Sequence, residues 1–178
     1  MASTAKPTIK NFILDVDGVM TDGRFYYTAE GKFMKSFGPD DSDALSLLRH
    51  YVNILFVSGD KKGFEISRKR IETDMKYPLY SVSTFERVEW MQGAGYNLDE
   101  TIYMGDGIFD AMVFDRVAYG IAPANGFQFT KDTADFVTPS TGGNSAVAEA
   151  CLHIMETFFE PVDLLHISDK VTGGEWIK

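Results

Sequence analysis

The feature that most constrains this chain is a series of short apolar segments, each ending in glycine and polar residues. Residues 9–14, 53–57 and 101–104 are apolar and four to six residues long, the length of strands buried on both faces of a sheet. Further short strands are expected at 77–82, 117–121 and 135–137, with a loop between the last two. Helices are expected at 40–50, 61–72, 83–91, 108–115 and 144–159. This alternation predicts an α/β fold with a central parallel sheet and helices on both faces.

One segment interrupts the alternation directly after the first strand. Residues 24–37 carry two aromatic-rich stretches around Thr28-Ala29-Glu30-Gly31, a sequence typical of a hairpin turn. With 178 residues in total, the chain is expected to form a single domain over 1–178. Its tail, about 161–178, has no clear pattern.

Composition excludes several classes of function. The formal net charge is −9, which argues against a nucleic-acid-binding surface. No apolar run is long enough for a transmembrane helix, and the N-terminus lacks the apolar region of a secretory signal. The single cysteine, Cys151, cannot form an internal disulfide, which is consistent with a reducing compartment. We therefore expect a cytoplasmic protein without a membrane or nucleic-acid partner.

Polar side chains follow three of the predicted strands. Asp15 and Asp17 follow the first, Ser58 the second, and Asp106 with Asp110 a later one. Taken singly, each is typical of a turn or a helix cap. Together they are expected to converge at the carboxyl edge of the sheet, where ligands of open α/β sheets bind.

These residues carry a resemblance. The segment DVDGVMTDG at 15–23 resembles the first motif of the haloacid dehalogenase (HAD) superfamily, Ser58-Gly59 its second, and GDGIFD at 105–110 its fourth. The resemblance implies a Rossmann-like HAD fold and phosphoryl-transfer chemistry. Within the superfamily, dehalogenases lack the second aspartate of the first motif, so Asp17 points to hydrolysis of a phosphate ester.

The resemblance also implies roles. Asp15 would be the nucleophile that forms an aspartyl-phosphate, and Asp17 the general acid and base. Mg²⁺ would be held by the Asp15 carboxylate, the Asp17 carbonyl and Asp106, with Asp110 in support, since hard oxygen ligands suit that ion.

The transferred phosphoryl group would contact Ser58, Gly59 and nearby backbone N–H groups. Gly18 would let the backbone pass close to the phosphate.

The third motif is where the sequence departs from the superfamily, which expects a lysine here. No lysine lies between Tyr77 and Asp106, and Arg87, 19 residues before Asp106, is the best substitute. A count without gaps points to Ser83 instead, and Lys76 is a weaker alternative. Arginine and lysine differ in geometry, and a solvated helix residue is the other interpretation of Arg87.

Large insertions are missing between the motifs, so we expect a capless member. The stretch 21–45 and the segment 138–155 resemble the small phosphatases that act on 3-deoxy-D-manno-octulosonate 8-phosphate (KDO 8-phosphate) and related nonulosonate 9-phosphates, and the phosphatase-like domain of CMP-sialate synthetases. That resemblance implies a homotetramer built through the 24–37 hairpin, in which one subunit helps to close the next site. The tail ending in Gly173-Gly174-Glu175-Trp176 is expected either to reach a neighbouring site or to be disordered.

Two departures leave the sugar open. The octulosonate phosphatases usually carry arginine where Asp60 stands, and GGRG where this chain has Gly142-Gly143-Asn144-Ser145. Lys61 and Lys62 could compensate for the missing cations, although a solvated surface is the simpler interpretation. We expect a Mg²⁺-dependent sugar-phosphate phosphatase, and the alternative is a weak or inactive HAD-like assembly domain.

Overall fold

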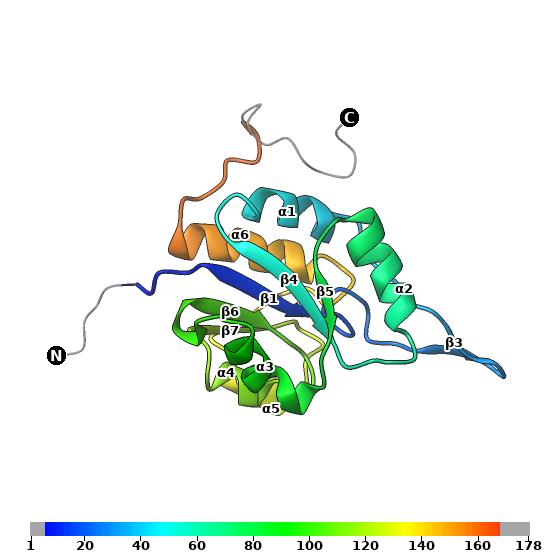
Figure 1. Ribbon diagram of the computed structural model, residues 1–178. Coiled ribbons are helices and arrows are strands. Elements are labelled where there is room, and N and C mark those ends of the chain that lie inside the picture. The colour runs from blue at the N-terminus through cyan, green and yellow to red at the C-terminus, as the bar shows by residue number, and fades with distance from the viewer. Residues whose placement is uncertain (1–5, 168–178) are drawn as a thin grey trace.

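The structure, a computed structural model, describes residues 6–167 and is built on a six-stranded sheet (Figure 1). The strand order is β5-β4-β1-β6-β7-β8, and every pairing is parallel. The strands are β1 (Asn11–Asp15), β4 (Asn53–Ser58), β5 (Leu79–Ser81), β6 (Thr101–Met104), β7 (Tyr119–Ala122) and β8 (Phe136–Val137). The expected Rossmann-like fold with a parallel central sheet is confirmed.

Helices cover both faces of this sheet (Figure 1). On one face lie α1 (Asp40–Leu48) and α6 (Ala146–Phe158), and on the other α3 (Arg87–Gly93), α4 (Ala111–Phe114) and α5 (Gln128–Thr133). Side chains alternate along β1, so Phe12 and Leu14 enter the core on one face while Ile13 enters the core on the other. Burial on both faces is the reason that the centre of β1, from Phe12 to Leu14, is apolar.

Some expected helices differ from those observed. The helix expected at 61–72 begins at α2 (Phe64–Arg68) and continues in a π-helical segment (Lys69–Asp74). It starts late because the Asp60 carboxylate accepts a hydrogen bond from the Gly63 N–H at 3.1 Å, which closes a turn first. The region between β7 and β8 is not only loop, since it contains α5.

Short 3₁₀ turns, Thr84–Glu86 and Leu98–Glu100, precede α3 and β6.

The predicted hairpin consists of β2 (Tyr26–Thr28) and β3 (Gly31–Met34), an antiparallel pair separate from the main sheet. It extends away from the body of the molecule (Figure 1). Phe25, Tyr27 and Phe33 are more than half exposed. Within 6–167 no second domain covers the sheet edge, and no helix is long and apolar enough to cross a membrane. The prediction for the tail at 173–176 concerns residues outside the described range.

Candidate active site

The carboxyl ends of β1 and β4 open onto a cleft of about 550 Å³. Its lining includes Asp15 and Asp17 from the end of β1, Asp60 and Lys61 from the loop after β4, and Arg87 from α3. The hairpin adds aromatic side chains to one wall. Parallel pairing of β1 with β4 and β6 brings segments that are distant in the sequence to this edge.

Arg87 lies at the base of the cleft and is only 2% exposed. Its guanidinium donates to the Asp15 carboxylate at 3.0 Å and to the Asp110 carboxylate at 2.6 Å. It also contacts the hydroxyl of Tyr103, which donates to Asp110 at 2.8 Å. Although burial opposes the charge, Tyr103 and the two carboxylates raise the pKa of Arg87 above its usual value. Arg87 is therefore a buried cation beside Asp15 and not a solvated helix residue.

The two alternatives to Arg87 lie elsewhere. Ser83 lines the cleft, but it carries no charge. Lys76 is exposed, has a left-handed backbone (φ 64°), and is not among the residues that line the cleft.

Three carboxylates form a compact cluster. One oxygen from each of Asp15, Asp106 and Asp110 lies within 4.8 Å of the others. Burial raises the pKa of Asp106 to about 8, with repulsion from Asp15 and Asp110 adding to the effect. Burial, opposed by the Arg87 charge, raises the pKa of Asp15 to about 7. Buried carboxylates that repel one another in this way fit a divalent cation, because its charge would stabilise their ionised forms.

The oxygens of the cluster are not equally free. Asp110 accepts from Arg87 and Tyr103 with one oxygen and from the Gly107 N–H, at 2.8 Å, with the other. Asp106 has no comparable side-chain partner among the described contacts. Asp15 and Asp106 could therefore coordinate a metal directly, and the bonds of Asp110 could hold the surrounding groups in place.

The loop after β1 fits closely around these groups. Gly18 has a φ of +88°, and a Cβ atom there would lie 2.0 Å from a carboxylate oxygen of Asp106. The Gly18 carbonyl accepts from the Asn125 side chain at 2.9 Å, and that side chain accepts from the Gly142 N–H at 2.6 Å. A Cβ on Gly142 would lie 2.0 Å from the Gly18 oxygen. Glycine at 142 is thus required for the turn to pack on the loop.

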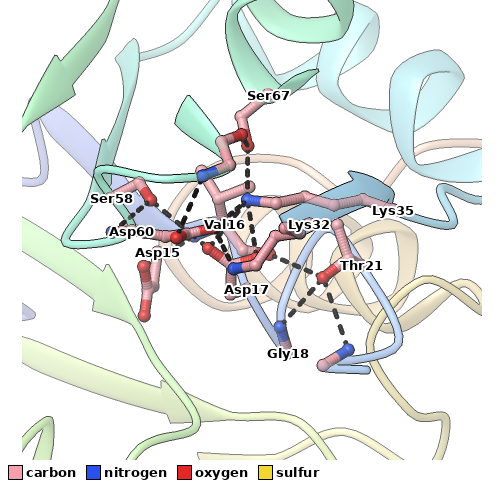
Figure 2. Close-up of polar contacts among 12 residues, drawn as sticks. Asp15, Val16, Asp17, Gly18, Thr21, Lys32, Lys35, Ser58, Asp60 and Ser67 are labelled. Atoms are coloured by element: carbon pink, nitrogen blue, oxygen red, sulfur yellow. Dashed lines mark hydrogen bonds and ion pairs between the residues drawn. The ribbon is translucent and has the colours of Figure 1, made fainter. Parts of the chain in front are cut away.

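Asp17 faces a different set of partners (Figure 2). Its carboxylate lies 2.7 Å from the ammonium group of Lys35 and accepts from the Ser58 hydroxyl at 3.3 Å. Ser58 is fully buried, and its hydroxyl also accepts from the Asp60 N–H at 3.1 Å. In this structure Ser58 therefore holds Asp17 and the loop after β4.

Asp60 is the second carboxylate that pairs with Lys35. Its carboxylate pairs with Lys32 and, at 3.0 Å, with Lys35. Burial alone would raise the pKa of Asp60, but hydrogen bonds from the two lysines lower it to about 2. Lys61 and Lys62 are the two lysines that could compensate for the missing cations. Lys61 lines the cleft, and Lys62 is exposed.

Sequence reasoning missed Lys32, Lys35 and Asn125. The lysines lie on the hairpin, whose sequence indicates only alternating aromatic and polar residues. Nothing in the sequence indicates that the hairpin folds back so that these ammonium groups reach the loop after β4. Asn125 lies in the β7–β8 connection, which was expected to be plain loop.

Comparisons with known proteins agree with this arrangement. Residues 87–151 match the family of haloacid dehalogenase-like hydrolases. The chain is 32% identical over 146 residues to 3-deoxy-D-manno-octulosonate 8-phosphate phosphatase of Haemophilus influenzae, covering 79% of each protein. It is 27% identical over 147 residues to the enzyme of the same name from Escherichia coli K12, covering 80% of this chain and 77% of the relative.

Solved structures show the same similarity. A cobalt-bound octulosonate 8-phosphate phosphatase from Haemophilus influenzae superposes with a TM-score of 0.73 at 28% identity, covering 85% of this chain and 90% of that one. The phosphatase from Moraxella catarrhalis, in complex with a magnesium ion, a phosphate ion and KDO, gives a TM-score of 0.71 at 28% identity, covering 83% of this chain and 86% of that one.

Proposed function

Since this chain belongs to the haloacid dehalogenase-like hydrolases, we propose that it is a Mg²⁺-dependent phosphatase that hydrolyses a sugar phosphate monoester. The substrate we propose is KDO 8-phosphate, with a nonulosonate 9-phosphate as the alternative sugar. The observation that carries the proposal is the placement of Asp15, which faces the cleft with a buried guanidinium at 3.0 Å.

In the proposed first step, an Asp15 oxygen attacks phosphorus and the bond between phosphorus and the ester oxygen breaks. Asp17 gives its proton to the leaving alkoxide, and the product is an aspartyl-phosphate on Asp15. Asp17 then takes a proton from the water that attacks this phosphate, which releases inorganic phosphate and restores Asp15.

Two chain elements would support these steps. Arg87 supplies a positive charge beside the attacking carboxylate, which reduces its repulsion from the substrate. Gly18, Gly59 and backbone N–H groups around the cleft would contact the phosphoryl oxygens, with Ser58 holding the loop after β4.

Asp15 and Asp106, with the Asp17 carbonyl, would hold Mg²⁺, and Asp110 would orient them. When bound, the ion would neutralise charge between the nucleophile and the phosphoryl group. Oxygen-only ligands and the raised pKa values of Asp15 and Asp106 support this assignment.

Evidence for the sugar is the similarity to relatives named for KDO 8-phosphate. The family resemblance implies arginine at the position of Asp60, and the charge of Asp60 is offset by Lys32 and Lys35. Lys61 in the cleft wall remains as a cation for a sugar carboxylate.

We further propose a cytoplasmic homotetramer in which hairpins of neighbouring subunits pack together. The exposed Phe25, Tyr27 and Phe33 support this, because burying large aromatic side chains at an interface removes them from water.

Phosphate release from a panel of sugar phosphates, with Mg²⁺ or with EDTA, tests the function. The panel includes KDO 8-phosphate, a nonulosonate 9-phosphate and glucose 6-phosphate. We expect release that needs Mg²⁺, is abolished by Asp15→Asn and is unchanged by Asp115→Asn, a matched change of an exposed aspartate. If the folded protein hydrolyses no member of the panel, the proposal fails.

A further inference from the structure

Lys35 is a buried lysine that none of the predicted motifs includes. It follows β3 on the hairpin, and its side chain is 0% exposed. Its ammonium group lies 2.7 Å from an oxygen of Asp17, 3.0 Å from Asp60 and 2.8 Å from the Ser67 hydroxyl (Figure 2).

These three partners match the chemistry of the group. A lysine ammonium has three N–H donors, and here three acceptors from three elements surround it. Burying a charged lysine is unfavourable unless it is paired and hydrogen-bonded. Hydrogen bonds to Asp17 at 3.1 Å and Ser67 at 2.8 Å, with the ion pair to Asp60, fix the position of the ammonium group and of the Asp17 carboxylate.

The Lys35 side chain packs closely against the loop after β4. A Cβ on Gly63 would lie 2.7 Å from the Lys35 side chain and 2.3 Å from the Asp60 carboxylate. Asp60 is itself held by Lys32 and by the Gly63 N–H. The hairpin, the loop after β4 and the start of α2 therefore meet at one ammonium group.

We infer that Lys35 is a positioning residue, which holds the Asp17 carboxylate toward the leaving group, and that Asp60 holds Lys35 in place. The inference rests on the proposed role of Asp17 as the acid. In that step the proton leaves Asp17 as the ester bond breaks, and the carboxylate left behind is the form with which the ammonium pairs. Ser58, at 3.3 Å, is the second group that orients Asp17.

The test uses the leaving group of the substrate. An alkoxide needs a proton as it leaves, whereas 4-nitrophenolate leaves readily without one. We would measure kcat/KM, which reports the steps up to release of the alcohol, for 4-nitrophenyl phosphate and for the best sugar phosphate of the panel. Lys35→Met is expected to lower kcat/KM by about 10²-fold for the sugar phosphate, the lower range for general acid catalysis, and by less than about 10-fold for 4-nitrophenyl phosphate.

A double variant separates positioning from charge balance. Lys35→Met alone leaves Asp60 and Asp17 without their shared cation, which could destabilise the fold. Lys35→Met combined with Asp60→Asn removes that excess charge. If Lys35 positions Asp17, the double variant keeps the selective loss on the sugar phosphate. Equal losses on both substrates, or recovery in the double variant, would overturn the inference.

Two further variants make failures distinguishable. Asp17→Asn must show the same selective loss, because otherwise the assigned acid is wrong and the inference falls with it. Activity that survives Asp15→Asn would instead overturn the proposed function. Lys69→Met, which removes an exposed lysine paired with Asp74, is the matched control and should change neither rate constant.

Discussion

Replacing Arg87 with methionine should destabilise the protein severely. Methionine is of similar length and apolar, so the change removes the charge while largely filling the space. Asp15 and Asp110 would then remain buried without the cation that lies 3.0 and 2.6 Å from them.

Breaking a buried ion pair by removing one partner costs about 3–5 kcal/mol of unfolding free energy. For a protein of this size, each kcal/mol corresponds to roughly 2–4 °C in Tm, so the expected drop is about 6–20 °C. Arg87→Lys should have a Tm between those of the original protein and Arg87→Met. Its single ammonium group restores the charge but not the paired donors of the guanidinium.

Urea unfolding in EDTA measures the effect without a contribution from metal. The matched control is Arg68→Met, which removes an exposed arginine paired with Glu65 on α2. Surface pairs contribute only about 0–1 kcal/mol. A difference of less than about 1 kcal/mol in the free energy of unfolding between the two variants would contradict the conclusion that Arg87 compensates buried carboxylates.

The remaining predictions concern the carboxylates, a tight turn and the cysteine. Because the pKa values of Asp15 and Asp106 are raised to about 7 and 8, the folded metal-free protein holds protons that the unfolded chain has released. Its stability is therefore lost as pH rises through these values, and scanning calorimetry in EDTA should give a higher Tm at about pH 5.5 than at about pH 8.5, with Mg²⁺ raising Tm most at the higher pH. Gly142→Ala would place a Cβ 2.0 Å from a carbonyl oxygen and should lower the free energy of unfolding by about 1–3 kcal/mol or more. Gly93→Ala, with nothing within 4 Å of the new Cβ, should not lower it. Equal denaturation midpoints for the two variants would contradict the close packing at Gly142. Burial raises the pKa of the Cys151 thiol well above its usual value, so iodoacetamide should label it only after unfolding, and rapid labelling of the native protein would show that the site is open.

The parallel sheet was predictable because its strands are buried on both faces and therefore consist of short runs of apolar residues. The convergence of Asp15, Asp17 and Asp106 followed from the same logic, since parallel strands end at one edge. The hairpin was predictable from its turn residues and flanking aromatic side chains. In each case the signal is local, because neighbouring residues in the chain determine the pattern.

From the sequence, Arg87 was only one of several candidates for the third motif. It follows a short 3₁₀ turn, and whether its side chain points into the site or into solvent depends on how α3 packs against β6. The structure brings it against Asp110 and Tyr103, which lie on other elements. Helix propensity and spacing contain no information on that packing.

The alternation of strands and helices and the acidic residues at the carboxyl edge of the sheet follow from the sequence alone, because each depends on residues close together in the chain. The partners of the Asp17 carboxylate, in contrast, are visible only in the folded molecule. Lys35 is 18 positions away from Asp17 and Ser58 is 41 positions away, and the contact with Lys35 depends on how the hairpin folds over the sheet edge. Charges that are distant in the sequence become partners only when packing brings them together and excludes water. A local sequence pattern does not predict such pairs.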